Sequence, residues 1–249
     1  MTGTGAGTGA GRETQGPIVI AVDGPAAAGK GTLARRLADR LGYGYLDTGS
    51  LYRAVGIKTM RAGHDPADPE AAVAAARALV AEDLERPDLR GDEAAQAASQ
   101  VAAQAEVRQV LLDFQRRFAK APPGGRGAVL DGRDIGTIVC PDAHVKLFVT
   151  ASLPVRADRR LRELRDRGAA AIHSTVLRDM KERDARDSER DVAPLRPAVD
   201  AYVIDTSDLN PDTVLAVALA RVRAQLFMTQ DNAQDKGGSS LGNPGNPRQ

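Results

Sequence analysis

A lysine at the start of a predicted helix is the first residue of this sequence whose setting suggests chemistry. A short apolar strand over residues 18–22 precedes it, and the helical pattern begins at Lys30 itself. Backbone N–H groups and the positive end of the helix dipole attract anions at such a turn, and glycines let the backbone approach them closely. Together with the flanking elements, the spacing predicts a loop that binds the phosphates of ATP. Its residues are Gly24, Pro25, Ala26, Ala27, Ala28, Gly29, Lys30, Gly31 and Thr32.

The alternative for this segment is a tight strand-to-helix turn that binds nothing. The lysine, the spacing of the glycines and the flanking elements all argue against that alternative. Gly31 stands where most P-loops carry the Ser or Thr hydroxyl that holds Mg²⁺. We therefore expect Mg²⁺ to be held through phosphates and water, with no dedicated metal site. The same departure favours small-molecule kinases over GTPase switches.

Two further segments combine acids, arginine and glycine directly after predicted strands. They span residues 47–53 (DTGSLYR) and residues 131–137 (DGRDIGT). Ligands of parallel α/β sheets bind at the carboxyl ends of the strands. We therefore expect both segments to lie beside the phosphate-binding loop.

A third segment, residues 181–190, is charged throughout. A solvated helix face is the ordinary interpretation of such a run, because pairs four residues apart, such as Arg183 and Asp187, stabilise exposed helices. However, Arg183, Arg186 and Arg190 fall on one helical stripe, which suits a polyphosphate better than a structural role.

The remaining pattern alternates short apolar runs with helical stretches, which predicts an α/β fold with a parallel sheet covered on both faces. The expected strands are residues 18–22, 43–46, 128–130, 145–149 and 202–204. The expected helices are residues 30–41, 49–60, 71–82, 92–119, 152–167, 175–190 and 210–227. In the long helix over 92–119 we expect an apolar face formed by Val101, Val107, Val110, Leu111, Phe114 and Phe118.

Bulk properties limit the classes of function. The net charge is +1, so no overall field favours nucleic acid or a membrane surface. Cys140 is the only cysteine, and His64, His144 and His173 lack metal-ligand spacing, so we expect no metal cluster. We expect polar tails over residues 1–16 and 229–249, and a single cytoplasmic domain over 17–228 with no apolar signal or membrane-spanning segment.

Several motifs occur in one order along the chain: GPAAAGKGT, LDTGSLYR, AASQVAA, LDGRDIGT, and KERDARD followed by VAPL. Over about residues 18–226 the chain resembles the bacterial-type cytidylate kinases, which are P-loop nucleoside monophosphate kinases. This resemblance implies a three-layer fold with a five-stranded parallel sheet, a helical monophosphate-binding region at about 49–120 and a mobile lid at about 174–193. It also implies an enzyme that transfers the γ-phosphoryl group of ATP to CMP or dCMP. We expect the protein to be a monomer.

The resemblance also implies roles for particular residues. Those expected to stabilise the transferred phosphoryl group are Lys30, Arg133, Arg183 and Arg190. Those expected to bind the acceptor nucleotide are Thr48, Tyr52, Arg53, Ser99, Arg108, Arg133, Asp134, Arg183, Asp187 and Arg190. Among these, Ser99, Arg108 and Asp134 would contact the base. An aspartate suits cytosine, because it accepts from the N4 amino group and stays unpaired against O4 of uracil.

Rival interpretations differ in motifs that can be checked. The nearest rival among enzymes is another small P-loop kinase, such as an adenylate or shikimate kinase. Adenylate kinases usually have a DGFPR-type segment where this chain has DGRDIG. A non-catalytic guanine-nucleotide switch would need an NKxD segment, which this sequence lacks.

Two departures from the resembled family are visible. Ala27 stands where a glycine is common, and the stretch from Arg53 to Ser99 lacks the alternating β-branched residues of a small antiparallel sheet.

Overall fold

The computed structural model describes the backbone of residues 16–237 and the side chains of residues 16–226. One parallel sheet crosses this part of the chain in the strand order β2-β3-β1-β4-β5. Every strand that the sequence predicts is present, with its ends shifted by no more than two residues. The strands are β1 (Ile18–Asp23), β2 (Gly44–Asp47), β3 (Gly127–Gly132), β4 (Val145–Thr150) and β5 (Tyr202–Asp205).

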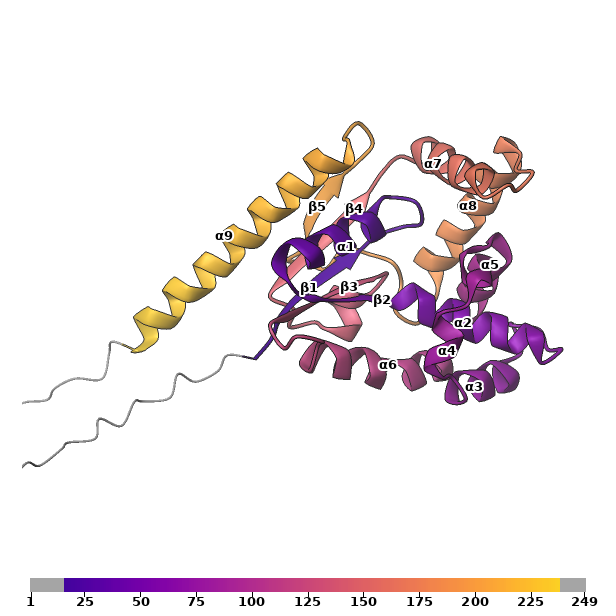
Figure 1. Cartoon of the computed structure of the whole chain (residues 1–249), viewed down its shortest axis with the longest axis horizontal. Helices are drawn as coiled ribbons and strands as arrows, with labels where there is room; N and C mark the ends of the chain where they lie inside the picture. The colour runs from indigo at the N-terminus through magenta and orange to yellow at the C-terminus, as the bar shows by residue number, and fades with distance from the viewer. Residues whose placement is uncertain (1–15, 238–249) are drawn as a thin grey trace, which may run out of the picture.

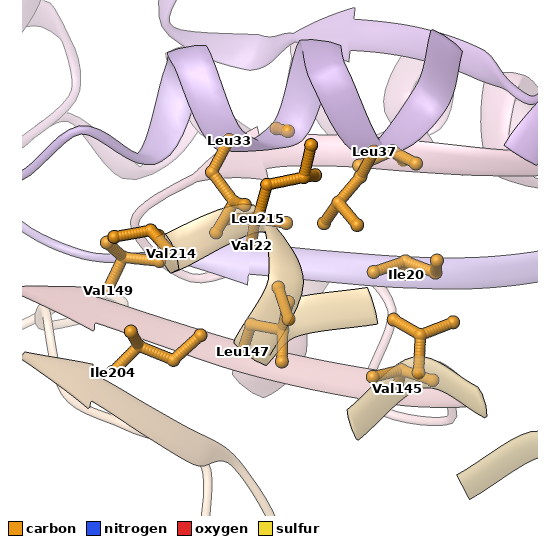
Figure 2. Packing of buried hydrophobic residues seen from close by; sticks show 14 of the residues in the cluster. Ile20, Val22, Leu33, Leu37, Val145, Leu147, Val149, Ile204, Val214 and Leu215 are labelled. Carbon is orange, nitrogen blue, oxygen red and sulfur yellow. The ribbon is translucent and has the colours of Figure 1, made fainter. Parts of the chain in front are cut away.

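Helices cover both faces of this sheet and produce three layers (Figure 1). Because side chains alternate along a strand, Ile20 of β1 packs with α1 (Lys30–Leu41) and α9 (Pro211–Gly237), as Figure 2 shows. Ala21 packs on the opposite face, with α6 (Ala105–Lys120) and the π-helix η2 (Ile135–Val139). The expected three-layer α/β class is confirmed.

A second group of helices lies beyond the carboxyl edge of the sheet, around an apolar cluster of its own. Its members are α2 (Thr48–Arg61), α3 (Pro69–Arg77), α4 (Ala81–Leu84), the 3₁₀ helix η1 (Pro87–Arg90) and α5 (Asp92–Val101). The stretch between α2 and α5 contains no strand in the structure, which agrees with its lack of alternating β-branched residues. Alanine-rich helices therefore form this side of the molecule.

Two further helices, α7 (Leu153–Asp166) and α8 (His173–Glu189), pack against each other on the other side of the same edge. Their apolar cluster includes Ala26 and Ala27 of the phosphate-binding loop. The charged stretch that the sequence marks as a helix is thus α8, and it contacts the loop through α7 and its own apolar face.

The single helix expected over residues 92–119 is wrong, because the chain breaks between α5 and α6. Val101 and Val107 are both fully buried in the same cluster. In an uninterrupted helix, six residues turn the chain by about 240°, so the two valines could not share a face. Phe114, which we also expected on the buried face, is 39% exposed. No Gly or Pro marks the break, so tertiary packing decides it.

Two smaller corrections concern helix ends. The helix expected over 71–82 is divided into α3 and α4, because the Asp83 carboxylate accepts from the Val80 N–H at 3.0 Å and begins a new helix. Helix α9 continues past Phe227 to Gly237, so residues 229–237 are helical rather than part of a tail. The other tail residues, 1–15 and 238–249, lie outside the described part. No helix among the described residues is long and apolar enough to cross a membrane.

Gly56 allows helices α2 and α5 to pack closely. A methyl group added at Gly56 would lie 2.6 Å from Cβ of Ala97. Helix propensity favours alanine over glycine by about 1 kcal/mol, but overpacking costs about 1–3 kcal/mol. We expect Gly56→Ala to lower the free energy of unfolding by about 1 kcal/mol, measured by urea denaturation.

The double variant Gly56→Ala/Ala97→Gly is the control, since it removes the methyl group that the new side chain meets. It should recover part of the loss through packing, although the glycine introduced in place of Ala97 lowers the helix propensity of α5. A Gly56→Ala protein more stable than the wild type would show that this approach does not constrain the fold.

Candidate active site

The strand register brings the predicted segments to one edge of the sheet. Asp47 at the end of β2 pairs in register with Asp131 of β3, and Asp23 at the end of β1 pairs with Gly132. The phosphate-binding loop follows β1, and the two acidic segments follow β2 and β3. The segments that sequence reasoning singled out at strand ends therefore lie side by side, as expected.

The backbone of the loop requires the glycines that the sequence supplies. Gly24 has φ 148°, and an added Cβ would lie 1.9 Å from the Val149 carbonyl oxygen. Gly29, the N-cap of α1, has φ 90°. Ala27 also adopts a positive φ of 57°, which costs a non-glycine residue about 1–2 kcal/mol. The alanine thus occupies a glycine-like conformation, and the loop retains its shape at that cost.

Lys30 lies at the base of this loop, facing the two other segments. Its Nζ donates to the Pro25 carbonyl at 3.5 Å and lies 3.8 Å from Asp131 Oδ1. Burial, and then the nearby Arg133 guanidinium, lower the pKa of Lys30 to about 8. A phosphate group would stabilise the protonated lysine, because its negative charge offsets both the loss of water and the repulsion from Arg133.

Two cavities meet at this lysine. The larger, of about 1020 Å³, is lined by loop residues including Ala26, Ala27, Gly31 and Thr32. The smaller, of about 80 Å³, lies between α2, α5, α8 and the end of β3. The residues common to both linings are Lys30, Asp47, Arg53, Arg133 and Arg183. One donor nucleotide and one acceptor could therefore meet end to end among these charges.

Ion pairs arrange the charged residues around the smaller cavity. Arg133 donates from Nε to Asp187 at 3.0 Å, and Arg53 donates to Asp47 at 2.7 Å. Arg108 forms a buried ion pair with Asp134. Asp134 therefore pairs with Arg108 and not with the adjacent Arg133, so it does not serve as the anchor of Arg133.

Three polar residues predicted to contact the acceptor also line this cavity, but some of their groups are already engaged. The Thr48 hydroxyl donates to the Asp131 carbonyl at 2.7 Å. The Tyr52 ring lies under Arg108, whose Cζ is 5.6 Å from its centroid. Ser99 accepts from Arg186 through its Oγ at 3.2 Å. Thr48 thus mainly fixes the backbone, whereas Ser99 keeps its hydroxyl proton available.

Several buried polar atoms around the cavity lack a hydrogen-bond partner among the described residues: Arg53 Nε, Asp131 Oδ1, Arg183 Nε and Arg190 Nη2. Burial and the nearby Arg133 lower the pKa of Arg183 to about 10. Unpartnered guanidinium N–H groups are costly to bury unless a ligand satisfies them. Their concentration here marks a site shaped for an anion.

The three arginines expected on one stripe of α8 do not act together. Arg183 lines both cavities, whereas Arg186 points to α5, where it donates to Ser99 and Gln96. Arg190 caps the end of the helix, outside its regular turns, and lines the smaller cavity. The expectation of one stripe is therefore wrong, because the helix ends before Arg190 and the Arg186 side chain is directed to α5.

Sequence reasoning missed two buried carboxylates and an arginine. Asp23 accepts from the Ile135 and Gly136 N–H groups, both at 2.8 Å, and so holds the segment that carries Arg133 and Asp134. Burial raises the pKa of Asp23 to about 7. The signal for Asp23 was its place at the end of a buried strand, before the first loop glycine.

Of the other two, Asp131 lies in a segment that the sequence did mark, and Arg156 lies in an expected helix with no marked motif. The Asp131 carboxylate is buried opposite Lys30. Arg156 forms a bidentate pair with Asp184 at 3.1 and 2.6 Å and donates to the Ala26 carbonyl at 3.4 Å. It therefore links α7, α8 and the phosphate-binding loop, and no local spacing signals that link.

A parallel three-layer fold with a lysine-bearing P-loop facing an arginine-lined acceptor cavity defines a phosphotransferase of the nucleotide kinase class. The family model described as cytidylate kinase matches residues 20–224. The chain belongs to the cytidylate kinase family.

Two relatives of similar sequence agree with this assignment. The chain is 67% identical to a protein named cytidylate kinase from Paramagnetospirillum magneticum, over 81% of this chain and 95% of that protein. It is 60% identical to one of the same name from Rhodospirillum rubrum, over 81% and 95%. A solved structure from Eubacterium ventriosum aligns over 84% of this chain and 99% of that chain, with a TM-score of 0.48 and 16% identity.

The pKa of Lys30 predicts how affinity for ATP depends on pH. Below the pKa of about 8, Lys30 of the free protein is already protonated, so this group makes the affinity for ATP independent of pH there. Above it, ATP must bind together with a proton, and the dissociation constant should rise toward about tenfold per pH unit. Calorimetric titration between about pH 7 and 9.5, in buffers of different ionisation enthalpy, measures both the affinity and the proton uptake.

Lys30→Arg is the control, because a guanidinium stays charged throughout this range. Its pH profile should be flat, whatever its absolute affinity. A flat profile and no proton uptake in the wild-type protein would contradict the expected state of Lys30.

Proposed function

We propose that this protein transfers the γ-phosphoryl group of ATP to CMP or dCMP, yielding ADP and CDP or dCDP. The observation that carries the proposal is the meeting of two cavities at one set of charges: Lys30, Asp47, Arg53, Arg133 and Arg183. The P-loop lines the larger cavity, and the residues expected to contact a pyrimidine line the smaller one. Membership of the cytidylate kinase family supports the choice of acceptor over AMP or shikimate.

Phosphoryl transfer needs positioning and charge neutralisation more than covalent chemistry. In the proposed reaction, backbone N–H groups of Gly24 to Thr32 and the start of α1 bind the phosphates of ATP. Lys30 and Arg183 neutralise the equatorial oxygens of the transferred group, and Arg190 joins them. Arg53 and Arg133 hold the acceptor phosphate in line.

The pyrimidine would lie deeper, between Tyr52, Ser99, Arg108 and Asp134. Asp134 is 5% exposed and paired with Arg108, so its remaining acceptor capacity is fixed in direction. An N4 amino group of cytosine satisfies that capacity, whereas O4 of uracil repels it. Asp187, held by Arg133, would meet the pentose together with Arg183.

The side chains around the P-loop suit the Mg²⁺ that accompanies ATP only if phosphate oxygens and water coordinate the ion. Gly31 offers no hydroxyl, and the described residues contain no cluster of three or more metal-ligating side chains. Asp131 Oδ1 is buried near Lys30 and has no hydrogen-bond partner among the described residues, so it can accept from a metal-bound water. We propose that phosphate oxygens and water hold Mg²⁺ here, where the ion supplies further charge neutralisation.

A mobile lid is part of the proposal, at about residues 174–193. The smaller cavity, at about 80 Å³, is well below the roughly 300–1000 Å³ of ligand sites, so a nucleotide cannot enter without displacement of a wall. Helix α8 forms one wall and buries few apolar residues: Val176 and Met180 with α7. Movement of this helix costs little apolar burial, and its return excludes water from the transferred group.

Other aspects of the proposal rest on composition and family. We propose a cytoplasmic protein that acts as a monomer, in pyrimidine nucleotide metabolism. Its partners are the small-molecule substrates, without nucleic acid or membrane.

A coupled ADP-release assay across CMP, dCMP, UMP, AMP and shikimate tests the reaction, with CMP or dCMP expected to give the highest kcat/KM. Asp134→Asn then tests base recognition. Leaving a buried polar group unpaired costs about 1–3 kcal/mol, and an amide can turn its NH₂ toward O4 of uracil. We expect the variant to lower kcat/KM for CMP and to reduce the CMP-to-UMP ratio by about tenfold.

The competing interpretation is that Asp134 only holds Arg108. In that case the folded variant would lose activity on both nucleotides in proportion. An unchanged CMP-to-UMP ratio would therefore decide against base recognition by Asp134.

Hydrogen exchange tests the lid. With a non-hydrolysable ATP analogue and CMP both bound, we expect amide exchange over residues 175–192 to slow by about tenfold or more. Either ligand alone should protect the segment far less, because each fills one of the two cavities that α8 lines. Amides of α9 serve as the reference, since that helix packs on the sheet away from both cavities. Equal protection of α8 and α9 would identify a global effect and contradict a lid.

A further inference from the structure

One arginine of α8 is engaged with the acceptor region but has no part in the reaction as described above. Arg186 donates from Nε to Ser99 Oγ at 3.2 Å and from Nη2 to Gln96 Oε1 at 2.8 Å. Among the described residues, these are the hydrogen bonds that join side chains of α8 to side chains of α5. Arg186 is thus the polar link between the proposed lid and the helix that carries Ser99.

The position of this link between the cavities is specific. Ser99 is 5% exposed and lines the smaller cavity, whereas Gln96 lines the larger one. Arg186 itself lines neither cavity. Its guanidinium therefore lies behind the wall of the acceptor site and acts on it only through the residues that it contacts.

The hydrogen bond from Arg186 determines what Ser99 can offer to a ligand. A serine hydroxyl has one proton to donate and two positions that accept. Arg186 occupies one accepting position and places a positive charge beside the oxygen, which disfavours the approach of a second donor. The hydroxyl proton remains free, so Ser99 faces the cavity as a donor.

A donor in this position matches the edge of a pyrimidine. Cytosine carries two adjacent acceptors, N3 and O2, whereas N3 of uracil bears a proton. The ion pair of Arg108 and Asp134 lines the same cavity, so donor and acceptor groups lie together there. Small side chains flank Ser99 on α5, namely Ala98 and, beyond the helix end, Ala102. No other polar side chain of α5 lines this cavity.

We propose that Arg186 is a positioning residue for acceptor recognition: it fixes the Ser99 hydroxyl as a donor to the base and connects that contact to the lid helix. The inference rests on the proposed function, since it assumes that a cytosine nucleotide fills the smaller cavity. It adds a residue that does not touch the substrate and acts through another side chain.

Arg186→Gln tests the proposal, because KM for CMP should change while KM for ATP and kcat should not. Loss of a hydrogen bond to a charged donor should raise KM for CMP by about tenfold. The KM for ATP and kcat should change by less than about twofold, because no contact to the P-loop is removed. Arg186→Lys keeps the charge but loses the fork that reaches two acceptors, so its KM for CMP should be intermediate.

A double-mutant cycle with Ser99→Ala separates positioning from general structural support. If Arg186 acts through Ser99, then Arg186→Gln adds less than about twofold to KM for CMP in the Ser99→Ala background. An equal increase in both backgrounds would overturn the proposal. Urea denaturation of each variant verifies folding, and Arg186→Lys carries the test if the glutamine variant does not fold.

Two matched variants complete the design. Arg178→Gln removes an arginine of the same helix whose partner, Asp179, lies on α8 itself, so it should leave KM for CMP unchanged. Gln96→Ala removes the other acceptor of Arg186 and should change KM for CMP by less than about twofold. A rise as large as that of Arg186→Gln would assign the effect to Gln96 and overturn the proposal.

The wild-type protein distinguishes the two levels of failure. A wild-type protein that does not phosphorylate CMP or dCMP would overturn the proposed function and this inference with it. If the wild-type protein is fully active but the effects of Arg186→Gln and Ser99→Ala on KM for CMP simply add, only the role of Arg186 is overturned.

Discussion

Mutual compensation of buried charges at the carboxyl edge of the sheet is the constraint on which the rest of this structure depends. Burying a charge costs several kcal/mol unless partners offset the loss of water, and this edge gathers acids and bases from four segments. Arg133 is balanced by Asp187, Arg53 by Asp47, and Arg108 by Asp134. The first and third of these pairs join elements far apart in the sequence, whereas Arg53 and Asp47 belong to one continuous segment.

The charges around Lys30 are not fully compensated by the protein, which indicates what kind of ligand the site binds. The pKa of Lys30 is lowered and the pKa of Asp131 is raised, both primarily by burial. Arg183 and Arg190 leave N–H groups without partners among the described residues. A phosphate chain with its metal ion would supply both the anions and the acceptors that the residues lack. The protein therefore holds an electrostatic arrangement that bound nucleotides would complete, which is the basis of the catalysis by positioning that we propose.

Backbone irregularities place the arginines of this site. The break between α5 and α6 frees the Ala102 carbonyl, which accepts from Arg108 at 3.3 Å and from Arg190 at 3.5 Å. The π-helix η2 begins immediately after Asp134, and Asp23 accepts from its first two N–H groups. Regular helices at either place would change the positions of Arg108 and Asp134, which we propose contact the base.

The sequence alone determined the parts of this protein that depend on local pattern. Short apolar runs and glycine-containing turns located the strands, and strand ends predicted that residues 47–53 and 131–137 would meet the P-loop. Motif order indicated the family, which the family model over residues 20–224 confirms. These features were predictable because the periodicity of a strand and the conformation of a glycine turn are encoded within a few residues.

Tertiary structure decided which side chain pairs with which. Asp134 could have held Arg133, its neighbour in sequence, yet it pairs with Arg108 from another helix. The break after Val101 has no Gly or Pro to signal it, and arises because Val101 and Val107 share one apolar cluster. The Arg186 side chain donates to Ser99 of α5 and does not line a cavity with Arg183 of the same helix. Such choices depend on the free energy of burying charges and apolar groups together, and only the packed chain determines that balance.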